Sequence, residues 1–444
     1  MSAIIHNNFR KYNADNFIAS MSTNKVYLMI GKNDAWSGAS AGQYDDANPT
    51  DVLVPTPNDT TVSPYHHHLD MIAAKLIPAS SASHVIKRVN WTTGTVYAEY
   101  NHMTDDIIDT NFFVFTTAFR VYKCISNYGG ATSTVEPTGV STSIIETADN
   151  YRWKFMFEVP QSEVLKFVTT DWVSVKSPGD AGSDQLNVEN AAVNGALEHI
   201  DVTNGGTLYK YAVGTAQSGS STTIVLDAGE NATDDYYNGL TVYITSGTGA
   251  GQLRTISDYN GTTKTITISS AWTSGQEANN TSVYSIAPAV SITASGGSGT
   301  GAVARVSGVT GGVIKKVSMV TVGSGYRFAT ATVTSGGGSG AVIDPRIGPP
   351  GGHGKNAVSE LGGAFVMLNA KLVGNEGADF PVGDDFRKVH ILANPTTGGS
   401  AATGTTYNGA EIDDGSGSII YSEFRAPIMR ASDSTEDIKL VVEF

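Results

Sequence analysis

The sequence is poor in cysteine and in charge. Its 444 residues include a single cysteine, Cys124, so no internal disulfide can form and packing must hold the chain together. Only 16% of the residues are charged, against roughly 25% in an average soluble domain, which excludes disorder driven by charge. The apolar runs are too short for a secretory signal at the N-terminus or for a membrane span of about 20 residues. The composition therefore predicts a soluble, folded protein that is not exported by a general signal route.

Positive charge is scarce as well. The chain carries 28 basic and 42 acidic side chains, a net charge of −14, and its basic residues form no cluster longer than a dipeptide. Such a surface repels a phosphate backbone, so we expect no nucleic-acid partner. Glycine is abundant instead, with 49 residues. This is above the usual share of roughly 7% and indicates a turn-rich β protein.

Helical patterns concentrate in the first eighty residues. Apolar residues between Phe9 and Met21 lie loosely on one helical face and predict a short helix. Ser63 and Pro64 are typical of a helix start, and Pro78 ends the apolar pattern that follows them. The spacing therefore predicts a second helix between Ser63 and Pro78.

Alternating patterns predict strands after that. In Tyr151–Val159 aromatic and apolar residues alternate with Arg152, Lys154, Met156 and Glu158, which predicts a strand with one buried face and one mostly charged, solvated face. Four further segments show a similar pattern: Val26–Ile30, Phe113–Ile125, Val389–Leu392 and the last eight residues.

Composition changes sharply between about residues 177 and 355. Glycine, serine, threonine and valine dominate there, and the dipeptides Asn204-Gly205, Asn238-Gly239 and Asn260-Gly261 predict turns between short strands. Val290–Val303 recurs in degenerate form as Ala331–Val342, which suggests duplicated β-hairpins. We therefore predict a core of residues 1–176 and 356–444 and an inserted all-β region, 177–355, with 200–288 and 289–350 as two small modules. The predicted fold class is mainly β, with sandwich-like or barrel-like domains and a few short helices near the N-terminus.

Polar clusters give little sign of catalysis or metal binding. His66, His67 and His68 lie about 100° apart on the predicted helix, so at most two could share a metal, and solvated or interface histidines are the favoured interpretation. Cys124 lacks a Cys/His signature and is interpreted as a structural residue. Neighbouring carboxylates such as Asp413-Asp414 point to opposite faces of a strand, and the glycine clusters match no phosphate-binding motif. The sequence thus predicts no catalytic residue, no metal and no cofactor.

Aromatic residues of the inserted region support one alternative function. Exposed aromatic rings on a polar β domain can stack on sugars, so Tyr237, Tyr259 and Trp272 are candidate glycan-binding residues. Packing of the same residues in a core is the more frequent arrangement, because aromatic side chains dominate protein cores. The alternative is a receptor-binding adhesin that acts through the insertion.

Five segments outside the insertion together resemble a known family. They are Val26–Ser37 (VYLMIGKNDAWS), Phe119–Ile125 (FRVYKCI), Ile145–Pro160 (IETADNYRWKFMFEVP), Asp385–Pro395 (DFRKVHILANP) and Gly417–Phe444. In this order they resemble the homodimeric upper wedge subunit of the baseplate in T-even-like contractile-tailed bacteriophages. The insertion of roughly 175 residues is the main departure, because the family carries a much shorter, more charged segment there.

The resemblance implies a structural role in the virion. It implies a homodimer that contacts neighbouring wedge and tail proteins during assembly and host attachment, without catalysis or metal. The absence of an export signal suits assembly in the host cytoplasm. The net charge and the short apolar runs separately predict no nucleic-acid and no membrane partner. Nine residues of the matching motifs are the candidate structural or interface residues: Gly31, Trp36, Tyr122, Tyr151, Trp153, Phe386, Pro395, Arg425 and Pro427.

Overall fold

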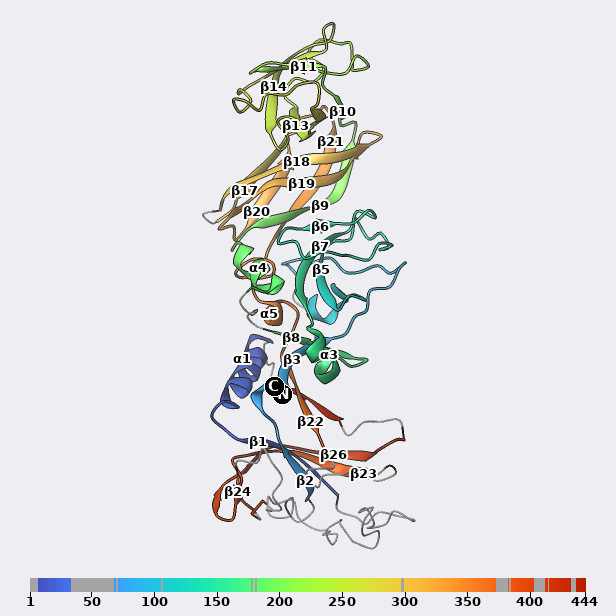
Figure 1. Ribbon diagram of the computed structural model, residues 1–444. Coiled ribbons are helices and arrows are strands. Elements are labelled where there is room, and N and C mark those ends of the chain that lie inside the picture. The colour runs from blue at the N-terminus through green and yellow to red at the C-terminus, as the bar shows by residue number, and fades with distance from the viewer. Residues whose placement is uncertain are drawn as a thin grey trace. The chain divides into compact units, whose positions relative to one another are not determined.

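The computed structural model of the chain is mainly β, with several antiparallel sheets and a few short helices (Figure 1). This confirms the predicted fold class. The structure describes residues 7–32, 68, 71–104, 107–176, 179, 182–296, 299–372, 382, 385–402, 412–413, 415–432 and 437–444. Within them no helix is long and apolar enough to span a membrane.

The chain divides into two compact units. Unit 1 comprises Met1–Arg88, Val159–Ser177 and Ala357–Phe444, and unit 2 comprises Val89–Glu158 and Pro178–Asn356. The predicted boundaries at 177 and 355 lie within two residues of two of the points where the chain passes from one unit to the other. The stretch 89–158, placed with the core in our prediction, packs in unit 2. The assignment of 177–355 as an inserted domain stays a prediction.

Unit 1 is a β-sandwich of two four-stranded sheets. One sheet has the order β2 (Met71–Leu76), β1 (Val26–Gly31), β23 (Asp385–Ala393), β26 (Ser418–Met429), and the other has the order β27 (Asp437–Glu443), β22 (Phe365–Lys371), β3 (Ala82–Lys87), β8 (Trp172–Val175). One core cluster takes buried residues from both sheets and from α1 (Asn7–Ser20). The smaller elements of the unit are η2 (Ala79–Ser81), α3 (Gln161–Phe167), α5 (Ala357–Glu360), β24 (Thr396–Thr397) and β25 (Ser400–Ala401).

Unit 2 begins with a sheet built by residues 89–158. Its order is β4 (Phe113–Phe115), β5 (Arg120–Ser126), β7 (Arg152–Glu158), β6 (Ile145–Glu146), and η3 (Ile107–Asp109) precedes it. The helix α4 (Asp184–Ala191) packs against β7. Ser183 caps this helix, since its side chain accepts a hydrogen bond from the Leu186 amide at 3.1 Å.

The rest of unit 2 forms three further sheets. A four-stranded sheet has the order β17 (Val290–Ala294), β20 (Ala329–Val333), β21 (Ser339–Ile347), β9 (Leu197–Thr207), and β18 (Thr300–Thr310) pairs with β19 (Val313–Ser324). The seven-stranded sheet is formed by β10 (Ala212–Thr215), β16 (Val283–Ala287), β13 (Thr241–Ser246), β14 (Leu253–Asn260), β15 (Thr265–Ile268), β12 (Thr223–Val225) and β11 (Ser218–Gly219).

Several predicted elements differ from the structure. The first helix is present as α1, but Phe9 and Tyr12 are exposed. The second predicted helix is wrong over Met71–Leu76, because this segment pairs with β1 as strand β2 and the pairing overrides a weak helical pattern. Phe113–Ile125 is a hairpin of β4 and β5 rather than one strand, with a turn at Phe119, whose φ is +58°.

The predicted insertion is β as expected, with two corrections. Asn204-Gly205 lies inside β9, paired with Val342 and Ala341, whereas Asn238-Gly239 and Asn260-Gly261 are turns or strand ends. The two copies of the repeat are not separate hairpins, because β17 of the first pairs with β20 of the second. Pairing between the copies joins them in one sheet.

Candidate functional site

The strand β7 has two different faces, and both are buried. Trp153 and Phe155 point into an aromatic core with Tyr122 and Tyr151, as the alternation predicts. Arg152 and Lys154 lie on the opposite face, and they are only 7% and 2% exposed. The prediction of a solvated charged face is therefore wrong, because other elements of unit 2 cover it. We call this covered polar region, which comprises Arg152, Lys154, Glu146, Lys316 and His199, the polar junction.

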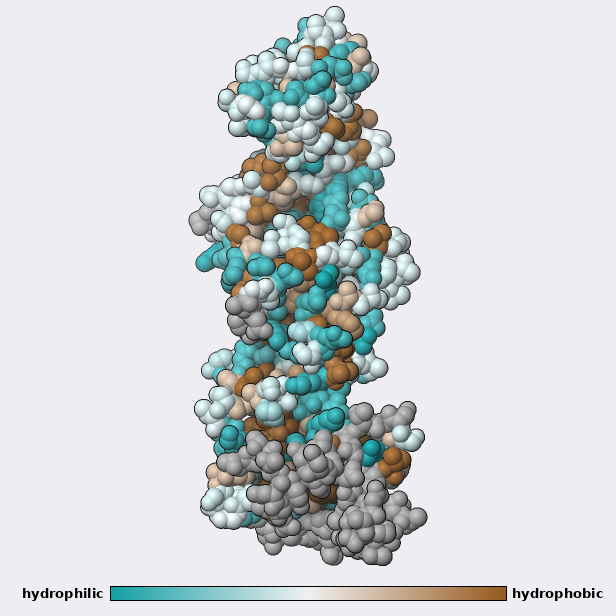
Figure 2. Space-filling model, in the orientation of Figure 1, coloured by the Kyte–Doolittle hydropathy of each residue, from teal (hydrophilic) through white to brown (hydrophobic). Residues whose placement is uncertain are grey.

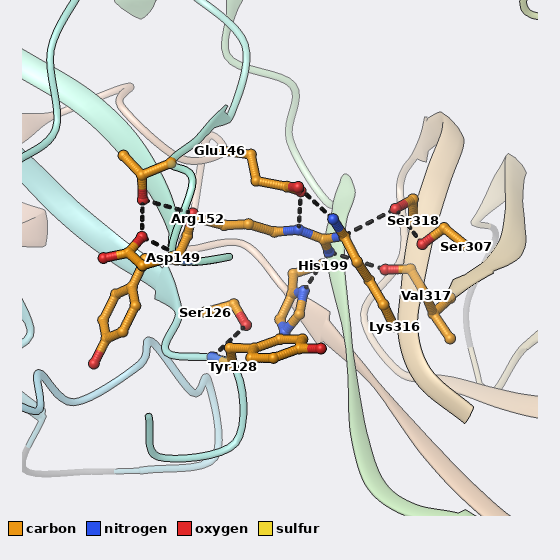
Figure 3. Close-up of polar contacts among 12 residues, drawn as sticks. Ser126, Tyr128, Glu146, Asp149, Arg152, His199, Ser307, Lys316, Val317 and Ser318 are labelled. Carbon is orange, nitrogen blue, oxygen red and sulfur yellow. Dashed lines mark hydrogen bonds and ion pairs between the residues drawn. The ribbon is translucent and has the colours of Figure 1, made fainter. Parts of the chain in front are cut away.

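Arg152 is the centre of the polar junction (Figure 3). Its Nε donates to Glu146 Oε2 at 3.2 Å, its Nη1 to the Val317 carbonyl at 2.9 Å, and its Nη2 to Ser318 Oγ at 2.9 Å. Val317 and Ser318 belong to β19, so one side chain of β7 connects two sheets. The buried guanidinium has partners on several sides, as a buried charge requires.

Glu146 connects two cations of the junction. It accepts from Lys316 of β19 as well as from Arg152 (Figure 3). Burial alone would raise the pKa of Glu146, but the hydrogen bond and charge of Lys316, together with Arg152, lower it below its ordinary value. The carboxylate is therefore held in its charged form.

His199 of β9 receives the fourth contact of Arg152. Arg152 Nη1 lies 3.2 Å from His199 Nδ1, and because a guanidinium only donates, Nδ1 must be the acceptor and Nε2 must carry the proton. Burial, followed by the charges of Arg152 and Arg346, lowers the pKa of His199 to about 3. The imidazole is thus neutral throughout the physiological range.

Lys154 is held by oxygen atoms on the same face of β7. Its Nζ donates to the Thr142 carbonyl at 2.8 Å and lies 3.4 Å from Glu198 Oε2 of β9. The ammonium replaces its lost hydration with these partners, which allows a lysine to be almost fully buried.

A second charged group surrounds Arg346 of β21. Its Nη1 lies 2.6 Å from Asp344, and its Nη2 lies 3.0 Å from Asp201 and 3.8 Å from Glu99. Burial and then the charge of Asp201 raise the pKa of Glu99. Three carboxylates therefore share one guanidinium.

One atom each of Glu99, His199 and Asp201 lies within 4.8 Å of the others, a spacing that a metal ion could use. Metal binding also requires a free lone pair on the imidazole. The lone pair of His199 faces Arg152, and Arg346 already supplies a cation to both carboxylates. The arrangement is that of an ion-pair cluster. Sequence analysis missed both charged groups, since their members are up to 247 residues apart in the chain.

The candidate motif residues fall into a buried set and an exposed set. Six of them are buried: Gly31, Tyr122, Tyr151, Trp153, Phe386 and Pro395. The rings of Tyr151 and Trp153 stack with centroids 5.3 Å apart, and the Tyr122 hydroxyl donates to the Gly139 carbonyl at 2.7 Å. Arg425 and Pro427 are exposed on β26, at the edge of the first sheet of unit 1. Trp36 lies outside the described residues.

The other candidates from the sequence are core residues. Tyr237, Tyr259 and Trp272 are at most 4% exposed in one core cluster, so they cannot stack on a glycan, and this assignment is corrected. Cys124 is buried, and burial raises the pKa of its thiol, as a structural cysteine requires. His68 is buried rather than solvated, while His66 and His67 lie outside the described residues.

Unit 1 contains a groove of about 560 Å³ between its two sheets. Its floor includes the core residues Phe386, Val389 and Leu440, and its rim includes Arg425 and Ile428 of β26. Ile420, Phe424, Ile428 and Met429 of the same strand are 38–63% exposed. On the face drawn in Figure 2, hydrophobic and hydrophilic residues otherwise alternate in small groups over the described part of the chain.

Comparison with known protein families gives a match for the C-terminal part of the chain. Residues 361–444 match the family model Phage-Gp8, described as Bacteriophage T4, Gp8. These residues include β22, β23, β26 and β27, which line the groove. No curated protein matches the chain. The matched family is a structural component of the tail baseplate. The match therefore supports a role for this chain as a structural component of a bacteriophage baseplate, located in the virion tail.

Proposed function

We propose that the protein is a homodimeric wedge subunit of the baseplate that docks neighbouring wedge proteins during tail assembly and host attachment. The observation that carries this proposal is the family match over residues 361–444, which coincides with four strands of the unit 1 sandwich. The order of the five motifs along the chain supports it independently. The role needs rigid surfaces rather than a reactive group, and the buried cores of the two units supply rigidity.

The exposed motif residues are the proposed dimer contacts. Arg425 and Pro427 lie in the matched segment, on an edge strand that also exposes Phe424 and Met429. Arg425 pairs with Glu423 at 2.9 Å, so the strand offers a cation and an anion beside apolar side chains. A second copy, related by a two-fold axis, would bring the same patch of both subunits together. Stable contacts of this kind bury about 800 Å² on each partner.

Light scattering on the purified full chain tests the dimer. We expect twice the mass of the chain at micromolar concentration, and a monomer for Met429→Asp, because a carboxylate buried in an apolar contact without a partner costs several kcal/mol. Val213→Asp is the matched control, since Val213 is 57% exposed in unit 2. A wild-type monomer would contradict the dimer. Absence of the protein from purified virions would contradict the structural role.

A further inference from the structure

Unit 2 consists of two bodies with their own apolar cores. We call Val89–Glu158, α4 and residues 351–356 the proximal body, and residues 197–347 the distal body. The cluster around Trp153 takes its residues from the proximal body, including Val188 of α4. The clusters around Val306 and Tyr326 take theirs from the distal body. Each body can therefore keep its core when the other moves.

The contacts that join the two bodies are largely polar. They include Arg152 with β19 and His199, and Glu146 with Lys316 (Figure 3). Glu99 with Arg346 is a further polar contact between the bodies. The Ile347 amide donates to His102 Nδ1 at 3.4 Å across the same junction. Domain interfaces of this polar kind permit relative motion more readily than apolar ones.

Two short segments carry the chain between the bodies. They are residues 192–196, after α4, and residues 348–350, which contain Pro349 and Pro350. The segments lie side by side, since the Gly351 amide donates to Asn194 Oδ1 at 2.9 Å. A Cβ on Gly352 would lie only 2.4 Å from the Val193 carbonyl oxygen, and φ is +97° there, so glycine is needed at this crossing.

A cavity of about 380 Å³ lies at the same two segments. It is lined by residues of both segments and by Gly325, Tyr326 and Arg327 of the distal body. Hinges in proteins are a few residues at the ends of elements that absorb changes in φ and ψ. The neighbouring cavity gives these segments room to do so without a clash.

We propose that residues 192–196 and 348–350 form a hinge and that the polar junction, together with the neighbouring ion pairs of Arg346, is its electrostatic latch. With the latch closed, Arg152, Lys316 and Arg346 hold the distal body against the proximal one. When these ion pairs break, the distal body rotates about the two segments while both cores stay intact. The outermost pair is Glu146 with Lys316, whose side chains are 41% and 20% exposed, so salt weakens it first.

Distance measurement between two spin labels on the full chain tests the latch. Labels at Thr138→Cys and Thr332→Cys lie on exposed positions of the proximal and distal bodies, and the native Cys124 is buried. We expect a narrow distance distribution at low salt that broadens at about 1 M NaCl, where the Debye length falls to about 3 Å. Lys316→Met should broaden it already at low salt. Hydrogen exchange of the Ile347 amide should become about fivefold faster in the same variant, the effect expected for one lost ion pair.

Lys315→Met is the matched control, because Lys315 is the exposed neighbour of Lys316 on β19. It should leave both measurements unchanged. Glu146→Gln is the second variant and should act like Lys316→Met, with circular dichroism confirming that each variant is folded. The latch is refuted if the distribution is already broad in the wild-type protein at low salt. It is equally refuted if high salt and both junction variants leave a narrow distribution, or if Lys315→Met broadens it as much as Lys316→Met.

Discussion

The two faces of β7 differ in chemistry but not in burial. On one face, Trp153 and Phe155 pack in an aromatic core, where shape and apolar area provide the stabilisation. On the other face, Arg152 and Lys154 are nearly as buried, and each depends on particular oxygen atoms of other elements. A charged face of a strand therefore marks the place where another part of the chain docks as readily as it marks the solvent.

The two faces of β7 also differ in how strictly they fix the arrangement of the elements packed against them. An apolar core tolerates changes that keep its volume. A buried guanidinium tolerates only an arrangement in which its donors find acceptors, so Arg152 fixes how β19 and β9 lie against β7. The apolar face thus provides most of the stability of the proximal body, and the polar face determines how the distal body is attached to it.

Trp153→Ala tests the apolar face of β7, and we expect it to reduce stability more than any other change considered below. Trp153 is fully buried and packs against Tyr97 and Tyr151. We expect a loss of about 3–5 kcal/mol in the free energy of unfolding of unit 2, as for other buried aromatic residues. Urea denaturation, monitored by hydrogen exchange of the β7 amides, measures this loss of stability. A loss below about 1 kcal/mol would show that the aromatic face does not form the core.

Arg152→Met tests the polar face of β7, and we expect a smaller loss of stability than for Trp153→Ala. The change keeps much of the side chain but leaves Glu146 and the Val317 carbonyl without one donor, which we expect to cost about 2–3 kcal/mol. Arg120→Met is the matched control on β5, because Arg120 pairs with Glu158 at the surface and should cost less than about 1 kcal/mol. Equal losses in the two variants, measured in urea, would show that burial of Arg152 adds nothing.

Much of the local structure followed from the sequence, but its assembly did not. Alternation located β7 and β27, and Asn238-Gly239 marked a turn, because these features depend on neighbouring residues. Met71–Leu76 was predicted as part of a helix because its strand partner, β1, lies more than forty residues away. Two partners of Arg152 are also distant in the chain, 47 residues away at His199 and 165 residues away at Val317, so no local pattern could show that its charge is buried.

Long-range packing also explains why the candidate glycan-binding residues are core residues instead. Tyr237, Tyr259 and Trp272 are aromatic residues in a polar segment, and the sequence alone cannot show whether such rings face solvent or a core. In the structure the Tyr259 hydroxyl donates to the Asn231 carbonyl at 2.5 Å, so its polar end is satisfied inside the fold. Local composition therefore predicted the class of the fold, and only the packing decided between binding and core residues.

The polar face also makes the stability depend on pH, and His199 contributes to that dependence. Its pKa is about 3 in the folded protein and near 6.5 when unfolded, so between these values the unfolded chain binds a proton that the folded chain does not. Stability must then fall as the pH drops from about 6.5 towards 3, by about 1.4 kcal/mol for each pH unit. His199→Asn keeps an acceptor for Arg152 without a titrating group. Between pH 6 and pH 4 the unfolding free energy of this variant should therefore depend on pH less steeply than that of the wild-type protein, by about 1.4 kcal/mol for each pH unit.

His353 is buried and has a lowered pKa too, so it contributes to the pH dependence of both proteins. Only the difference between the two slopes reports on His199. Parallel slopes in the two proteins would mean that His199 is protonated in the folded protein over this pH range, and Nδ1 could then not accept a hydrogen bond from Arg152.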